Sequence, residues 1–269
     1  MTEKRGRITF VGTGIAGAGQ CTQLAKSEIA HADAVFTIIP NPVTMAWLRE
    51  LNANVTCLRR HYAEGRDRRI TYQAMVDEMM AALYDGKRVV GAFYGHPGVF
   101  ACVGHWTIAR ARKEGFEARM EPGISAEDCL VADLGLDIGD HGCLSYEATQ
   151  FMIFDRPVDP GALLILWQIG IAGVCDYGQF ATTRDNLQIL VDLLAESYPR
   201  DHEVIVYRAA TLPPVERPRI DRMPLHKLPD AALDSGCTLV IPPCRAARPR
   251  DAIRARLGYD RQRAMAGDA

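Results

Sequence analysis

The stretch FYGHPGVF at residues 93–100 decides how the first half of the chain is interpreted. It follows the apolar run RVVGA at residues 88–92 and precedes ACVGHWTIARARKEG at residues 101–115, a segment with helical spacing. Two glycines and a proline at this point predict a sharp turn, not a longer strand. Because α/β proteins bind ligands at the carboxyl ends of their strands, this turn is a candidate binding element.

Strands and helices alternate on both sides of this turn. Apolar runs predict strands at residues 7–11, 34–40, 88–95 and 117–122. Segments with a helical period predict helices at residues 17–30, 71–86 and 101–115. This alternation predicts a mainly parallel sheet that is covered by helices on both faces.

The pattern changes after Glu121, Pro122 and Gly123. A short helix is expected at residues 125–134, and beyond it come three strand-like runs and one long amphipathic helix. The runs lie at residues 162–168, 203–210 and 237–243, and the helix lies near residues 184–197. The predicted fold class is therefore α/β, with two α/β domains at residues 1–121 and 122–243 and an arginine-rich tail at residues 244–269. We expect the ligand in the cleft between the domains.

Composition excludes several classes of protein. The 269 residues are 48% hydrophobic and carry a net charge of -2, which argues against general nucleic-acid binding. No apolar run reaches the roughly 18 residues of a membrane span, and no signal-like segment follows the first residues, so a cytoplasmic protein is expected. The cysteines include no CxxC pair and the histidines show no ligand spacing, so no metal site is expected.

The tail is rich in arginine. Its arginines are Arg245, Arg248, Arg250, Arg254, Arg256, Arg261 and Arg263. Two interpretations stay open: a solvated and partly frayed helix, or a docking surface for an acidic partner.

The segment GTGIAG at residues 12–17 matches the glycine pattern of dinucleotide-binding proteins. That fingerprint also requires an acidic residue at the end of the second strand, where it holds the ribose. Here the second strand ends in IIPNP, and Asp33 lies before the strand. The sequence therefore disfavours NAD.

Several motifs together resemble the tetrapyrrole-methylase superfamily. They are VGTGI, FYGHPGVF, MEPGISAEDCLVADLG, LSYEATQF, LWQIG and IPP. Within it, the combination of YGHPGVF with GRDRRITYQ resembles the borosin peptide α-N-methyltransferases. The resemblance implies two α/β domains with S-adenosylmethionine folded up between them. It also implies methylation of the backbone amides of a ribosomal peptide, with S-adenosylhomocysteine as the product.

The resemblance also assigns a cofactor pocket. Its residues are Gly12, Tyr94, His96, Val99, Phe100, Ser125, Ala126, Gln168, Ala209 and Thr238. Glycines in the turn let backbone groups approach a charged ligand closely. For His96 an alternative stays open, because a histidine in a turn commonly caps its own loop.

An amide nitrogen is a poor nucleophile, because its lone pair is delocalised into the carbonyl group, so catalysis requires that its proton be removed or shared. A tyrosine can take the amide proton only if a cation stabilises its phenolate, and the same cation can stabilise the developing imidate oxygen. Arg68 and Tyr72 are four residues apart, so in a helix they share one face. The resemblance makes them the catalytic pair, with Tyr62 and Tyr94 as nearby phenols. Arg69 is the alternative arginine.

The resemblance further implies the partners. We expect a separate precursor peptide supplied in trans, since the tail after IPP offers no apolar core, and a homodimer that forms a heterotetramer with the precursor. The segment MAWLRE and the helix face of Met75, Met79 and Met80 are the apolar surfaces expected between subunits. Two other functions stay open: a tetrapyrrole or other small-molecule methyltransferase, and a non-catalytic cofactor-binding scaffold.

Overall fold

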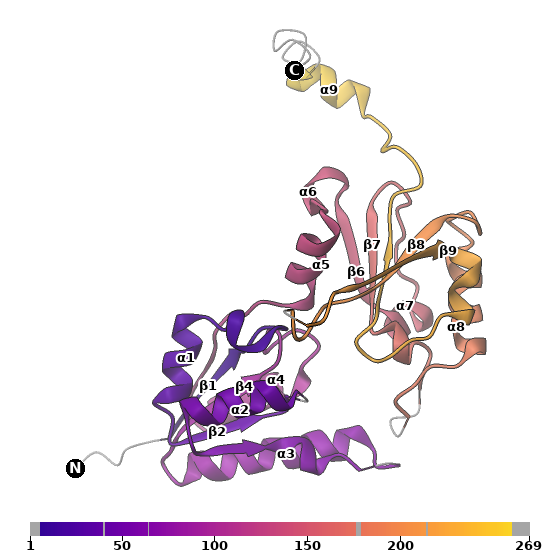
Figure 1. The fold of residues 1–269 in the computed structure, drawn as a ribbon. Helices are drawn as coiled ribbons and strands as arrows, with labels where there is room; N and C mark the ends of the chain where they lie inside the picture. Colours follow the sequence, from indigo (N-terminus) through magenta and orange to yellow (C-terminus); the bar gives the residue numbers. More distant parts are fainter. Residues whose placement is uncertain (1–5, 40, 64, 176–178, 214, 260–269) are drawn as a thin grey trace.

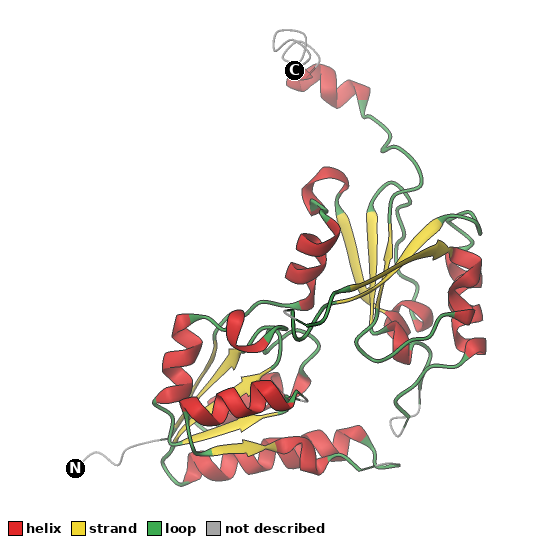
Figure 2. Ribbon diagram, in the orientation of Figure 1, coloured by secondary structure: helices red, strands yellow, loops and turns green. Residues whose placement is uncertain are grey.

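Two β-sheets, each with its own helices, make up the protein (Figure 1, Figure 2). The computed structural model describes residues 6–39, 41–63, 65–175, 179–213 and 215–259. The first sheet has the strand order β3-β2-β4-β1-β5, and all of its pairings are parallel. Its strands are β1 (Arg7–Gly12), β2 (Ala34–Thr37), β3 (Val55–Cys57), β4 (Arg88–Phe93) and β5 (Glu117–Met120). The prediction of a parallel sheet in the first half is confirmed.

Helices cover both faces of the first sheet, as the alternation predicts. They are α1 (Gln23–Ala30), α2 (Pro42–Leu51), α3 (Arg68–Tyr84) and α4 (Cys102–Lys113), with the short 3-10 helices η1 (Gly17–Gly19) and η2 (Leu58–His61). Ile8 and Phe10 of β1 pack with α3 and α4, whereas Val11 packs with α1 and α2. Successive strand residues point to opposite faces, so one strand supplies both cores.

Several details of the first half differ from the prediction, and strand β3 is one that the apolar runs do not predict. Residues 17–30 do not form one helix, because α1 begins only after Thr22, whose hydroxyl accepts a hydrogen bond from the Ala25 N–H. Helix α2 was not predicted at all. Its first turn is capped by Asn41, whose side chain accepts hydrogen bonds from the N–H groups of Val43 and Thr44.

The apolar face of α3 belongs to the core. Met75, Met79 and Met80 have no exposed surface and pack in the same cluster as Phe10. Trp47 of α2 is half-buried against the core on the opposite face of the sheet. The expectation that these methionines form a surface between subunits is therefore wrong, because α3 turns this face toward its own sheet.

The second sheet is mixed, which confirms the antiparallel character expected for this half. Its strand order is β6-β7-β10-β8-β9; β6 and β7 are parallel and the other pairs are antiparallel. The strands are β6 (Cys143–Glu147), β7 (Leu163–Trp167), β8 (Glu203–Arg208), β9 (Arg219–Pro224) and β10 (Thr238–Ile241). We propose that the boundary between the two domains lies at residues 121–122, between the two sheets.

Helices also lie on both faces of the second sheet. They are α5 (Ala126–Leu134), α6 (Ile138–His141), α7 (Ala148–Ile153) and α8 (Arg184–Leu194), with η3 (Ile169–Ile171) and η4 (Leu225–Asp230). Leu190 of α8 packs on the face of Leu164, and Leu130 of α5 packs on the face of Ile165. Ile15, from the loop after β1, joins the α5 cluster. The first half of the chain therefore inserts a side chain into the core of the second.

The last described helix, α9 (Asp251–Leu257), lies away from both sheets (Figure 1). It has no buried residue, and Leu257 is 71% exposed. Across the described parts of the chain, no helix combines the length and the apolar character needed to cross a membrane.

Candidate active site

Three backbone segments meet where β1 and β4 end. The Thr13 N–H donates to the carbonyl oxygen of Phe93 at 2.8 Å, and the Gly95 N–H donates to that of Gly14 at 2.9 Å. A Cβ atom on Gly12 would lie 2.3 Å from the Gly95 carbonyl oxygen and 3.1 Å from the Gly123 Cα. Only glycine fits at residue 12, so Gly12 shapes the loops around the site; it is not among the residues that line the three cavities described below.

The FYGHPGVF segment forms the predicted turn after β4. Gly95 has a φ of +69°, which a residue with a Cβ rarely adopts. The His96 Nδ1 accepts a hydrogen bond from the Gly98 N–H at 3.0 Å, so this histidine caps its own loop. Its ring also lines a cavity, so the two interpretations of His96 are compatible.

That cavity, here called the turn cavity, has a volume of about 120 Å³. It is built from both halves of the chain. Eight of the residues assigned to the cofactor line it: Tyr94, His96, Val99, Phe100, Ser125, Ala126, Gln168 and Thr238. Its other lining residues, which the sequence did not single out, are Ile15, Gly95, Glu127, Trp167, Ser235 and Gly236.

Polar groups of the turn cavity are held by local contacts. Ser125 caps α5: its Oγ accepts from the Glu127 and Asp128 N–H groups, and its own N–H donates to Asp128 Oδ2 at 2.6 Å. Burial raises the pKa of Tyr94, and the negative charge of Asp234 adds to the rise. Tyr94 therefore stays protonated at neutral pH and can donate a hydrogen bond into the cavity.

A second cavity of about 350 Å³, here called the tyrosine cavity, contains the predicted catalytic pair. Arg68 and Tyr72 come from the first two turns of α3. The remaining lining residues come from the second half of the chain: Glu147, Thr149, Gln150, Ile153, Gln168, Ile171, Val174 and Cys175. Gln168 lines both this cavity and the turn cavity, so the two are neighbours.

Tyr72 lies in an aromatic cluster. Its ring centroid is 6.2 Å from those of Tyr62 and Trp106, in edge-on contacts. The Arg68 guanidinium lies 5.4 Å above the ring of Phe180, which also contacts Tyr62. The structure thus brings together three of the four residues predicted to be catalytic, whereas Tyr94 lines the turn cavity instead.

The two phenols differ in role. Burial raises the pKa of Tyr72, while hydrogen bonds from Tyr62 and Arg68 act to lower it. Burial and the hydrogen bond to Tyr72 both raise the pKa of Tyr62. Within the pair, the neighbouring phenol acts to lower the pKa of Tyr72 and to raise that of Tyr62, so Tyr72 is the phenol that can more readily become a phenolate.

Arg69 points to a different partner. Its side chain pairs with Asp67, with 2.6 Å between Nη2 and Oδ2, and the Asp67 carboxylate also caps the start of α3. Arg69 does not line the tyrosine cavity, whereas Arg68 does.

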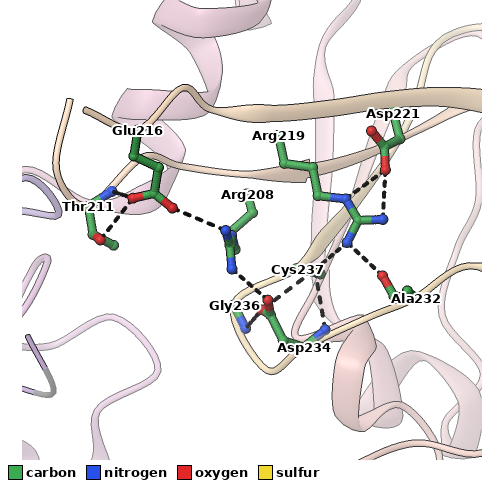
Figure 3. A network of polar contacts seen from close by, with 9 residues as sticks. All are labelled: Arg208, Thr211, Glu216, Arg219, Asp221, Ala232, Asp234, Gly236 and Cys237. Atoms are coloured by element: carbon green, nitrogen blue, oxygen red, sulfur yellow. Dashed lines mark hydrogen bonds and ion pairs between the residues drawn. The ribbon is translucent and has the colours of Figure 1, made fainter. Parts of the chain in front are cut away.

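A third cavity of about 640 Å³, here called the side cavity, lies beside α5. Ala209, the remaining residue assigned to the cofactor, lines this cavity, together with Asp128 and Cys129 of α5. Glu216 of its wall belongs to a network of ion pairs (Figure 3): Arg208 donates to Glu216 at 3.1 Å and to Asp234 at 2.7 Å. Because Asp234 precedes Ser235 and Gly236 in the chain, this network joins the side cavity to the turn cavity.

Among the described residues, no group of three or more His, Cys, Asp or Glu side chains is arranged to hold a metal ion. The polar side chains that line the two adjoining cavities are instead two phenols, one guanidinium, one imidazole, one thiol, and hydroxyl and amide groups, with Glu127 and Glu147 as the carboxylates.

The chain is similar to known proteins over most of its length. It is 42% identical over 261 residues to the methyltransferase/ribosomally synthesized cyclic peptide gymnopeptides precursor of Gymnopus fusipes, covering 95% of this chain and 62% of that protein. It is 40% identical over 227 residues to the methyltransferase/ribosomally synthesized type I borosin cyclic peptide precursor of Coprinopsis marcescibilis, covering 84% of this chain and 58% of that protein. The chain thus spans about 60% of the length of these relatives.

The fold is also that of a solved structure, the uroporphyrin-III-C-methyltransferase of Thermus thermophilus. The TM-score is 0.64 at 18% identity, and the match covers 89% of this chain and 93% of that one. Residues 7–225 match the family described as Tetrapyrrole (Corrin/Porphyrin) Methylases. The chain therefore belongs to the tetrapyrrole methylases, a family of methyltransferases.

Proposed function

We propose that this protein is an S-adenosylmethionine-dependent methyltransferase that methylates backbone amide nitrogens of a ribosomally made precursor peptide. The observation that carries this proposal is the cluster of Arg68, Tyr62 and Tyr72 beside a cavity assigned to the cofactor, with Gln168 in the wall of both. The names of the relatives, each of which joins a methyltransferase to a peptide precursor, support it.

The residues of the turn cavity fit S-adenosylmethionine, the cofactor of the tetrapyrrole methylases. Val99, Phe100 and Trp167 offer apolar surface, while Ser125 and Thr238 offer hydroxyl groups. The turn cavity alone is too small for the whole molecule. Because the first turn of α5 contributes to both the turn cavity and the side cavity, we propose that the two together form the cofactor site, with Ala209 on the side-cavity wall.

When bound, the cofactor supplies an electrophilic methyl group and leaves as S-adenosylhomocysteine. The protein has to make the amide nitrogen nucleophilic. The phenolate form of Tyr72 would accept the amide proton while the nitrogen takes the methyl group and the S–C bond to that methyl breaks, and Arg68 would stabilise both the phenolate and the negative charge on the amide oxygen. Tyr62, whose ring contacts Tyr72, acts to lower the pKa of Tyr72 and so favours the ionised form of the base.

A nicotinamide cofactor does not fit the first sheet. Asp33 is the acidic residue nearest to β2, and its carboxylate accepts a 2.8 Å hydrogen bond from the Arg88 N–H, at the start of β4. This contact lies at the end of the sheet opposite to the turn cavity, since β4 begins at Arg88 and ends before Tyr94. Asp33 therefore cannot hold a ribose beside the turn.

We also propose that the peptide is a separate chain supplied in trans, that the enzyme is a cytoplasmic homodimer, and that it forms a heterotetramer with its precursor. The methionine face of α3 takes no part in such a dimer, because its side chains are buried in the core of the same chain. The exposed apolar side chains of α9, Ile253 and Leu257, are available for contacts between chains.

Two measurements test the proposal. Calorimetry with S-adenosylmethionine, S-adenosylhomocysteine and NADH should show binding of the first two and none of NADH. Incubation with S-adenosylmethionine and the peptide encoded by the adjacent reading frame should then add methyl groups to that peptide. Fragmentation mass spectrometry should locate them on backbone nitrogens.

Each alternative predicts a different outcome. Binding of the cofactor with methylation of a tetrapyrrole, and of no peptide, would favour a small-molecule methyltransferase. Cofactor binding without transfer to either acceptor would favour a non-catalytic scaffold. A ladder of methyl groups on the protein itself would exclude supply in trans, and a mass of one chain in light scattering would exclude the homodimer.

A further inference from the structure

The segment that leads to Tyr62 is fastened to α3 by one carboxylate. Glu78 accepts a hydrogen bond from Arg60 Nη2, and its Oε2 lies 2.7 Å from His61 Nε2. Arg60 and His61 end the short helix η2, directly before Tyr62. Glu78 is 24% exposed and His61 is 22% exposed, so water screens this contact less than it would a surface ion pair.

Two more contacts hold the same segment. Thr71 Oγ1 donates to the carbonyl oxygen of His61 at 3.3 Å. Thr71 and Glu78 are seven residues apart and therefore lie on the same face of α3. Leu58, the first residue of η2, is fully buried in the cluster that contains Met75. Both polar and apolar contacts thus fix η2 along α3.

The position of η2 decides where the Tyr62 hydroxyl lies. Tyr62 follows η2, with its N–H donating to the Arg59 carbonyl oxygen at 3.0 Å, and the residue is 36% exposed. Its ring contacts Tyr72 and Phe180 only at their edges. Because these edge contacts leave Tyr62 partly exposed to solvent, we expect its orientation to depend on the backbone that carries it.

We propose that Glu78 is a positioning residue of the methyl transfer: by holding Arg60 and His61 against α3, it keeps the ring of Tyr62 in its edge-on contact with Tyr72. The kinetic consequence rests on the function proposed above, whereas the contact between the two phenols does not. Glu78 touches neither cavity and acts only through Tyr62.

Displacement of Tyr62 should change the pKa of Tyr72 in one direction. The contact with Tyr62 acts to lower the pKa of Tyr72, so loss of that contact should raise it. The other groups that face Tyr72 are Arg68 and Cys102, and Arg59 faces Tyr62. Replacing Glu78 removes none of these groups. The titration of Tyr72 should therefore move to higher pH only if Tyr62 has moved.

The test compares Glu78→Ala and Glu78→Gln with Tyr62→Phe and with the double variants. Glu78→Gln keeps the size of the side chain and guards against a failure of the alanine variant to fold. Asp77→Asn is the matched control, because Asp77 is the neighbouring carboxylate on α3 but contacts Gln73 and Arg110. Calorimetry with S-adenosylhomocysteine checks that each variant keeps its cofactor site.

We expect Glu78→Ala to lower kcat by up to about 10²-fold, since displacement of a catalytic group by about 1 Å has that effect. Cofactor affinity and the KM for the peptide should stay unchanged, and the rise of kcat with pH should shift to higher pH. In the Tyr62→Phe background, Glu78→Ala should have almost no further effect. Equal losses in both backgrounds, or an unchanged pH profile, would overturn the proposal.

A second readout needs no turnover. In protein with isotope-labelled tyrosine, the Tyr72 signal, assigned with Tyr72→Phe, should titrate at higher pH in Glu78→Ala and in Tyr62→Phe, and at the parental pH in Asp77→Asn. If no peptide is methylated by the parental protein, the proposed function fails, and this titration still decides the role of Glu78. A Tyr72 titration unmoved by Glu78→Ala rejects that role.

Discussion

Phe100 and Gln168 are the two residues other than glycine that have a positive φ in the described part of the chain, and both line the turn cavity. One comes from the turn after β4 and the other follows β7, so the strained positions belong to different halves of the protein. A left-handed backbone costs about 1–2 kcal/mol for such residues. It persists where the surrounding structure enforces it, and such positions cluster at functional sites.

Two substitutions at residue 168 separate the backbone strain from the contribution of the side chain to cofactor binding. Gln168→Ala removes the side chain and keeps the strained backbone, whereas Gln168→Gly removes both. We expect the glycine variant to be more stable than the alanine variant by about 1 kcal/mol, because glycine adopts the φ of +60° without a Cβ clash. Denaturant unfolding measures this difference.

Both variants should bind S-adenosylhomocysteine more weakly than the parental protein, since the amide group is gone from the wall of the turn cavity. Equal stability of the two variants would mean that the backbone at residue 168 relaxes without the side chain, and that it is not strained.

The close contact of Gly12 with Gly95 gives a second prediction. In Gly12→Ala the new Cβ would meet the Gly95 carbonyl oxygen at 2.3 Å, so the turn must shift. We expect a loss of about 1–3 kcal/mol in the free energy of unfolding, as for other overpacked sites, together with weaker cofactor binding. Gly19→Ala is the control, because no atom lies within 4 Å of a Cβ built there. Similar effects of the two substitutions would argue against this explanation.

Tyr72→Phe should keep the fold and the cofactor affinity but lower kcat by about 10²- to 10⁴-fold, the usual contribution of a general base. The pKa of Tyr72 is raised, so the base is mostly protonated at neutral pH. Parental activity should therefore increase with pH across the alkaline range, while Tyr72→Phe should lose this dependence. Tyr84→Phe, at the other end of α3, should behave like the parental protein. A pH profile shared by both variants would reject Tyr72 as the base.

Arg68→Ala and Arg69→Ala decide which arginine serves the reaction. Arg68 lines the tyrosine cavity together with Tyr72 and acts to lower the pKa of that phenol, whereas Arg69 pairs with Asp67. Arg68→Ala should lower kcat by about 10²- to 10³-fold, the cost of losing one group that stabilises an oxyanion. Arg69→Ala should affect mainly the stability of the first turn of α3. The reverse result in steady-state kinetics would shift the role to Arg69.

The turn after β4 and the alternation of the first half follow from local sequence signals. An apolar run that ends in glycine and proline has few ways to continue, so the strand end and the turn can be predicted together. Helix α2 is not predicted from the sequence, because Pro42 is assigned there only to the end of a strand. The pair Asn41 and Pro42 is also typical of a helix start, with the cap first and proline in the first turn.

The apolar face of α3 shows a different limit of prediction from sequence. The spacing of Met75 and Met79 correctly predicts one apolar face, but spacing does not say whether that face meets another subunit or the protein's own sheet. The contacts of Glu78 with η2 are similar in kind, because they join residues 17 and 18 positions apart and depend on how η2 folds back. No motif marks such a pairing.

The position of β10 in its sheet has a consequence for synthesis of the chain. The first sheet is complete once residue 120 has been made, whereas β7 and β8 pair not with each other but with β10, which comes last in the sequence of the second sheet. Until residues 238–241 leave the ribosome, β7 and β8 each expose an unpaired edge rich in apolar residues. We therefore expect the first half to fold during translation and the second half to form a sheet late, with nascent chains that end before β10 as the species most prone to aggregate and most dependent on chaperones.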